Sequence, residues 1–201
     1  MRRIALALIV LFVGLGPALS QSSDPAAQQI SRFYDALLAS MKGGKSLGVQ
    51  GRYRKLEPVI TQVFDLPDMT KYAVGPAWDK MSAADQQALI RAFTRMTVAD
   101  YAKNFDSYDG EQFTVDPNVQ TRGQDKLVST KLITASKSVT PFIYRMREAG
   151  GTWKVVDVFL NGFVSELATK RSDFASTVAS GGASALVAKI NSLADNLLKE
   201  G

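Results

Sequence analysis

The hydrophobic period of the chain changes twice, and this change most limits the folds open to it. Up to about Gly110, apolar residues recur every three or four positions, as on the buried face of a helix. Between residues 111 and 160 the period is two, which is typical of strands. Beyond Asn161 the helical period returns. This order of elements predicts an α+β domain.

The helical part of the pattern predicts several separate helices. Before Gly110 they are expected at residues 25–41, 52–64, 68–78 and 82–108. The glycine-rich segment 43–51 predicts a flexible loop between the first two. Ser82, with Asp85 three residues later, is expected to cap the longest helix. After Gly162 two more helical segments are expected, separated by a pair of glycines.

The period-two part predicts four strands, at residues 111–119, 126–134, 139–147 and 152–160. Their connections are short, which favours antiparallel pairing because a parallel crossover needs about a dozen residues. Pro141 suggests an edge or a bulge in the third strand. We therefore expect one domain over residues 21–201, with helices packed on one face of a curved, mainly antiparallel four-stranded sheet that encloses an apolar cavity.

The first twenty residues have the pattern of a signal peptide. Two arginines precede an apolar run from Ile4 to Leu19, and small residues stand at Ala18 and Ser20. This predicts export with cleavage before Gln21. A membrane anchor is the less favoured alternative, because the run is shorter than the roughly 18–20 residues that a spanning helix needs and contains two glycines and a proline.

The composition excludes several classes of function. The chain has no histidine and no cysteine, which removes Ser-His-Asp and Cys-His catalysis, disulfides and ordinary zinc sites. Without the two arginines of the signal peptide, the formal net charge falls from +5 to +3. This value is too small to indicate nucleic-acid binding. No cofactor motif or cluster of metal-binding carboxylates is present, so we expect neither a cofactor nor a metal.

Aromatic and methionine residues are numerous in both halves of the chain. One interpretation is an ordinary core; the other is a cavity for a lipid-like ligand, to which flexible methionine side chains are suited. With Val155 from the last strand, the candidate cavity residues are Phe64, Met69, Tyr72, Trp78, Phe93, Met96, Tyr101, Phe105, Phe142, Tyr144, Met146, Phe159 and Phe163.

Asp157 is a single carboxylate in the apolar strand 152–160. Strict alternation places it on one face with Trp153, Val155 and Phe159. It is either a general base in an apolar cavity, as in cone-shaped isomerases, or a structural residue at the corner between strand and helix. The structural role is favoured because no second proton-handling group is evident. Possible partners of the carboxylate are Lys131, Arg145 and Arg147.

Basic residues form two small groups elsewhere in the chain. They are Arg52, Arg54 and Lys55, and then Lys170 and Arg171. Either group could bind a phosphate headgroup or an acidic partner, but solvated helix faces are the simpler interpretation.

Several segments, in this order and spacing, resemble one known family. They are Pro58 with Phe64-Asp65 and Met69, VGPAW (74–78), FTRMTVADYAKNFDSYDG (93–110), IYRM (143–146), GTWKVVDVFLNG (151–162) and RSDF (171–174). Together they resemble the periplasmic lipid-binding component of Mla-type ABC transport systems, also called the toluene-tolerance or auxiliary-transport family. Val74 in place of the usual leucine, and a one-residue-longer segment after Gly162, look more like the hopanoid-associated HpnM-type branch.

The resemblance implies a function without catalysis. Such a protein is a periplasmic shuttle that carries a phospholipid or hopanoid between an outer-membrane lipoprotein or porin partner and an inner-membrane ABC transporter complex. The acyl chains would lie between the helices and the sheet. ATP hydrolysis would belong to the partner, since this chain has no phosphate-binding loop.

Overall fold

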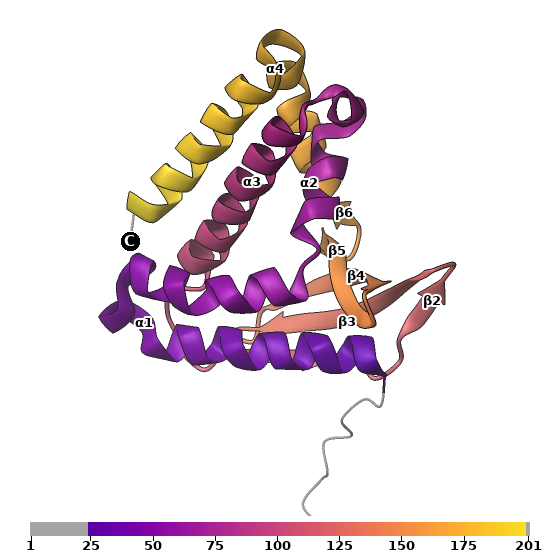
Figure 1. Ribbon diagram of the computed structural model, residues 1–201. Helices are drawn as coiled ribbons and strands as arrows, with labels where there is room; N and C mark the ends of the chain where they lie inside the picture. The colour runs from indigo at the N-terminus through magenta and orange to yellow at the C-terminus, as the bar shows by residue number, and fades with distance from the viewer. Residues whose placement is uncertain (1–23, 200–201) are drawn as a thin grey trace, which may run out of the picture.

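The computed structural model describes residues 24–199, so the predicted signal peptide lies outside the described range. The α+β class is confirmed, with helices before and after a single sheet (Figure 1). The elements are α1 (Pro25–Val63), α2 (Leu66–Val74), the 3-10 helix η1 (Gly75–Lys80), α3 (Ala83–Asn104), β1 (Gln112–Val115), β2 (Gln120–Arg122), β3 (Asp125–Ile133), β4 (Val139–Ala149), β5 (Thr152–Leu160), β6 (Val164–Ser165) and α4 (Glu166–Lys199).

The sheet is antiparallel, as predicted, in the order β1-β3-β4-β5-β6, and β2 also pairs with β3. Two short strands, β2 and β6, add to the four expected. The segment 111–119 was predicted as one strand, but β1 ends at Val115, before the turn at Pro117. β6 follows a tight turn in which Asn161 and Gly162 both have positive φ, and its pairing with β5 extends the sheet.

The prediction of a flexible loop at residues 43–51 is wrong, because most of this segment is helical and belongs to α1. The helix is broken only at Gly44 (φ 46°, ψ −136°) and Gly48 (φ 58°, ψ 174°), conformations that are open mainly to glycine. The two limbs of α1 consequently fold back on each other and run side by side (Figure 1).

Arg52 ties this helical hairpin to the rest of the molecule. Its side chain is buried, with 3% exposure. Its Nε donates to the carbonyl of Ala102 in α3 (2.7 Å) and its Nη1 donates to the carbonyl of Gly44 (3.2 Å). Arg52 is therefore a structural residue and is not part of a basic surface, whereas Arg54 and Lys55 are exposed.

Strict alternation along β5 is interrupted by a bulge. Arg145 of β4 pairs with Asp157, but the next residue, Met146, pairs with Val155. The extra residue, Val156, shifts the facing of the strand, so that Val155 and Val158 both join the core on the helix side of the sheet. The prediction that Val155 and Asp157 share a face is therefore wrong.

Helices α3 and α4 complete the fold above the sheet. α4 bends at Gly182 (φ 63°), and its second limb returns along α3 (Figure 1). Arg95 of α3 joins the two helices through an ion pair with Asp195 (2.6 Å) and a hydrogen bond to the carbonyl of Asn191 (3.3 Å). This arrangement leaves room between the helices and the sheet.

Candidate functional site: an apolar cavity with a charged mouth

A cavity of about 670 Å³ lies between the sheet and the helices, and its lining is mostly apolar. The walls come from the end of α1, from α2, α3, β4 and β5, and from both limbs of α4. This volume lies within the usual range for small-molecule sites. The lining residues are Phe64, Met69, Phe93, Met96, Thr97, Asp100, Tyr101, Asn104, Phe105, Thr140, Phe142, Tyr144, Val158, Leu160, Asn161, Glu166, Leu167, Lys170, Leu193, Asn196 and Leu197.

More than half of the candidate cavity residues meet in this cavity. They are Phe64, Met69, Phe93, Met96, Tyr101, Phe105, Phe142 and Tyr144. They come from α2, α3 and β4 and from the C-caps of α1 and α3, which are far apart in the sequence. On β4 the alternation brings Phe142 and Tyr144 to the same face, opposite Leu160 and Val158 of β5.

The other candidates do not line the cavity. Trp78, Met146 and Val155 are buried in the packed core. Phe159 lies on β5 between the two lining residues, Val158 and Leu160, and is itself absent from the lining. Tyr72 and Phe163 are exposed at 46% and 77%, respectively. From β5, Val158 and Leu160 line the cavity, whereas Val155 and Phe159 of the same strand and Phe163 beyond it do not.

Three further apolar lining residues come from α4 and were missed in the sequence. Leu193 and Leu197 lie one turn apart on its second limb, and Leu167 lies at its start. The helical period in this region predicts an apolar stripe, and this stripe is the one sequence signal that could have identified these residues. The stripe does not indicate whether it faces the core or an open space.

Aromatic rings of the cavity wall pack against further aromatic rings of the core. Phe33 contacts Phe64 and Tyr101 edge-to-face, with ring centroids 5.4 Å apart in each pair. Tyr34 exchanges a hydrogen bond with Thr130 (2.7 Å). Burial raises the pKa of the Tyr34, Tyr101 and Tyr144 phenols well above their usual value, so these groups stay uncharged at any physiological pH. The part of the cavity wall formed by Tyr101 and Tyr144 is therefore neutral.

Charged side chains lie only among the residues from α3 and α4 that line this cavity. They are Asp100, Glu166 and Lys170. Burial raises the pKa of Asp100 and of Glu166, and the Asp100 charge raises that of Glu166 further, while Lys170 opposes both shifts. Asp100 is nevertheless exposed, and Glu166 and Lys170 are half-exposed, so these three lining residues mark the mouth of the cavity.

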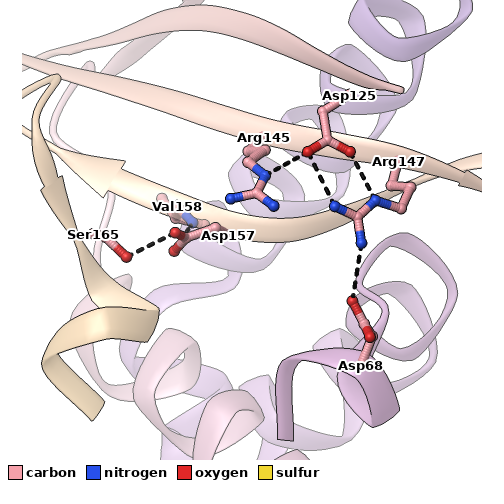
Figure 2. A network of polar contacts seen from close by, with 7 residues as sticks. All are labelled: Asp68, Asp125, Arg145, Arg147, Asp157, Val158 and Ser165. Atoms are coloured by element: carbon pink, nitrogen blue, oxygen red, sulfur yellow. Dashed lines mark hydrogen bonds and ion pairs between the residues drawn. The ribbon is translucent and has the colours of Figure 1, made fainter. Parts of the chain in front are cut away.

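Asp157 lies outside the large cavity and borders a smaller pocket of about 320 Å³. Its Oδ1 accepts from the backbone N–H of Val158 (2.8 Å), and its Oδ2 accepts from the Ser165 hydroxyl (2.7 Å) (Figure 2). The same Oδ1 also accepts from the backbone N–H of Leu167 (3.2 Å). The carboxylate thus joins β5 to β6 and to the first turn of α4. This geometry supports the structural role and removes the carboxylate from the cavity in which a general base was considered.

Asp157→Asn is expected to lower the free energy of unfolding by about 1–3 kcal/mol, because a buried amide cannot accept from all three donors. The loss of charge beside the N-terminus of α4 acts in the same direction. Urea denaturation measures the effect. Asp109→Asn, at an exposed position, is the matched control and should change little. Equal stability of Asp157→Asn and the wild type would contradict the structural role.

The predicted partners of Asp157 bind elsewhere. Arg145 and Arg147 both donate to Asp125, from Nε in each case and at 2.7 Å, and Arg147 also lies 3.6 Å from Asp68 of α2 (Figure 2). Lys131 is exposed on β3. The network ties β3 and β4 to α2, and its residues Asp68, Arg145 and Arg147 line the small pocket.

Gly75 of the VGPAW segment lines the smaller pocket together with Arg171, and this neighbour leaves little space for a side chain at position 75. Gly75 has φ 75°, and an added Cβ would lie 3.1 Å from Nε of Arg171. The Arg171 guanidinium stacks over the exposed ring of Tyr72, 5.2 Å from its centroid. Any other residue at position 75 would therefore be strained and would displace Arg171.

The stability contribution of Asp125 is expected to depend on pH. Hydrogen bonds and charge, first from Arg147 and then from Arg145, hold the pKa of Asp125 below its ordinary value of 3.8. A carboxylate whose pKa is lower in the folded state than in the unfolded state stabilises the fold above pH 3.8. This contribution is lost as the pH falls through the folded-state pKa. Asp125→Asn should therefore cost about 2 kcal/mol at pH 7 and progressively less below pH 4.

Thermal unfolding of both proteins between pH 7 and pH 3 measures this difference. Asp109→Asn serves again as the control, since its side chain is exposed. A difference that stays constant down to pH 3 would show that the carboxylate does not act through its charge.

Within residues 24–199, no helix is long and apolar enough to cross a membrane. The same residues contain no cluster of three or more carboxylates that could hold a metal ion.

Comparison with known proteins agrees with this architecture. The model of the MlaC protein family matches residues 31–192. The toluene tolerance protein ttg2D of Pseudomonas putida is 25% identical over 163 residues, which cover 81% of this chain and 75% of that protein. The structure of a phospholipid-binding protein from Ralstonia solanacearum, in complex with a phospholipid, matches with a TM-score of 0.76 and 20% identity, over 87% of this chain and 99% of that one. The chain belongs to the MlaC family.

Proposed function

We propose that this protein is a periplasmic lipid carrier without catalytic activity, in which the acyl chains occupy the cavity of about 670 Å³. The observation that carries the proposal is the lining itself. Phenylalanine, methionine, leucine and neutral tyrosine side chains form the walls, and the charged groups gather at α3 and the start of α4. An acyl chain needs such an uncharged environment, and a phosphate-bearing headgroup would lie among the polar residues.

The cavity suits a carrier rather than a storage protein for energetic reasons. Transfer of an acyl chain from water to an apolar environment is favourable by about 0.8 kcal/mol per methylene. For roughly 30 methylenes the free energy of transfer is on the order of 20 kcal/mol. The cavity must offer nearly the same free energy as a bilayer, or the lipid would not enter or would not leave. Mostly apolar walls, whose charged groups are confined to α3 and the start of α4, meet this requirement.

The ligand proposed is a phospholipid, for which two features argue. The matched protein from Ralstonia solanacearum is described as a phospholipid-binding protein in complex with a phospholipid. The mouth also carries Lys170, a cation that a phosphate could approach. A hopanoid is the alternative ligand, suggested by the longer segment after Gly162 in the sequence.

Membership of the MlaC family supports a proposed route of transport. The carrier would exchange lipid with an inner-membrane ABC transporter complex and with an outer-membrane lipoprotein or porin partner. Export through the signal peptide at residues 1–20 would bring it to the periplasm. Phe163, exposed at 77% on the turn next to the lining residue Asn161, is a candidate contact for the acyl chains during entry.

Native mass spectrometry of the purified protein tests the proposal. The expected result is a bound lipid, released by organic solvent and identified as a phospholipid or a hopanoid. Apo protein should also take up lipid from vesicles. A protein that contains no lipid after purification and takes up none from vesicles would overturn the proposal.

A further inference from the structure

The mouth of the cavity contains three charged groups that do not pair with one another. Asp100 comes from α3, and Glu166 and Lys170 lie one turn apart at the start of α4. Among residues 24–199, neither the Glu166 nor the Lys170 side chain takes part in a hydrogen bond or an ion pair within 4.0 Å, and the Asp100 carboxylate accepts only from the side-chain amide of its own helix neighbour Asn104 (3.0 Å). These groups are therefore available to a ligand.

The charge at the mouth is unbalanced. Two carboxylates face one ammonium group, and the uncharged polar groups around them are the amides of Asn104, Asn161 and Asn196. Burial is the main cause of the raised pKa of both carboxyl groups, and it outweighs the attraction of Lys170; for Glu166 the charge of Asp100 adds to it. A second cation at this position would stabilise both carboxylates.

We propose that the mouth selects a phospholipid whose headgroup carries a primary amine next to its phosphate. The inference rests on the proposed function of lipid carriage. The headgroup amine would lie between Asp100 and Glu166 and the phosphate would meet Lys170, so that each charge of a zwitterionic headgroup has a partner of opposite sign.

The chemistry of the headgroups explains the selectivity. A primary ammonium group has three N–H donors, which two carboxylates can accept in a compact geometry. A quaternary amine has the charge but no donor. A glycerol headgroup brings the phosphate without any cation, which leaves the two carboxylates uncompensated close to a further negative charge.

The test is a competition between headgroups. Apo protein is incubated with vesicles that contain equal amounts of phosphatidylethanolamine, phosphatidylcholine and phosphatidylglycerol with identical acyl chains, and the acquired lipids are quantified by mass spectrometry. Phosphatidylethanolamine should be enriched about tenfold over phosphatidylglycerol, as expected for one charge-assisted hydrogen bond. The enrichment over phosphatidylcholine should be smaller.

Variants identify the groups responsible. Glu166→Gln and the double variant Asp100→Asn/Glu166→Gln keep the shape of the mouth, and the amine preference should fall about threefold in the first and vanish in the second. Lys170→Gln should reduce uptake of all three lipids alike while the amine preference remains. Glu148→Gln, at an exposed carboxylate on β4 outside the cavity, is the control and should behave as the wild type.

The outcomes separate this inference from the proposed function. Uptake of all three lipids in equal amounts by the wild type would overturn the inference and leave lipid carriage intact. A preference that survives in the double variant would overturn it as well. No uptake of any lipid would overturn the proposed function.

Discussion

Thr97→Trp is expected to reduce lipid uptake from vesicles at least about tenfold without destabilising the fold. Thr97 lies on α3 in the wall of the cavity, where an indole ring would extend into space that acyl chains would otherwise occupy. Displacing two methylenes costs about 1.6 kcal/mol, or more than tenfold in partition. The bilayer that donates the lipid still buries these methylenes, so nothing offsets the loss.

The matched control for this variant is Arg91→Trp. Arg91 lies on the same helix, is exposed and is absent from the cavity lining. Uptake of a fluorescent phospholipid is measured for both variants, together with their melting temperatures. Normal uptake by Thr97→Trp, with the indole ring located in the cavity, would show that acyl chains do not bind there.

Arg52→Met is expected to lower the free energy of unfolding by about 3 kcal/mol, because it leaves two carbonyl groups without their charged donor in a buried place. Methionine retains much of the aliphatic length, so the loss reports the hydrogen bonds to Ala102 and Gly44. For a domain of this size, the melting temperature should fall by roughly 6–12 °C.

Arg54→Met is the control for Arg52→Met. Arg54 is two residues away on the same helix and is exposed, so its replacement should change the melting temperature little. If both variants were equally stable, the link between the α1 hairpin and α3 would not depend on Arg52.

The succession of elements could be predicted because it depends on local patterns. The capping side chain of Ser82, which accepts from the N–H of Asp85 (3.1 Å), starts α3 as expected. The helix expected at residues 68–78 corresponds to α2, which ends at Val74 with Gly75 as its C-cap. Local signals of this kind act over one turn and need no tertiary contact.

Other features could not be predicted because distant contacts outweigh local propensity. The glycines of residues 43–51 suggested a loop, yet the segment is largely helical and its turn is held by Arg52 and the end of α3. In β5, the bulge opposite Arg145 and Met146 reversed the facing of Val155. A bulge depends on the partner strand and leaves no trace in the alternation of a single strand.

The candidate residues illustrate the same limit. Trp78 and Phe93 belong to equally apolar patterns, but Trp78 is in the packed core and Phe93 lines the cavity. Periodicity identifies the apolar face of a helix or strand. It does not indicate whether that face meets other side chains or an open space.

The sequence by itself determined the class of fold, the antiparallel pairing and the apolar character of the future walls, because these follow from period, turn length and composition. Only the tertiary structure decided that α3, α4 and the sheet stand apart around a cavity, that Asp157 holds a corner outside it, and that Asp100, Glu166 and Lys170 meet at its mouth. The physical reason is that cavities and charge clusters arise where several elements converge, and no single segment encodes that convergence.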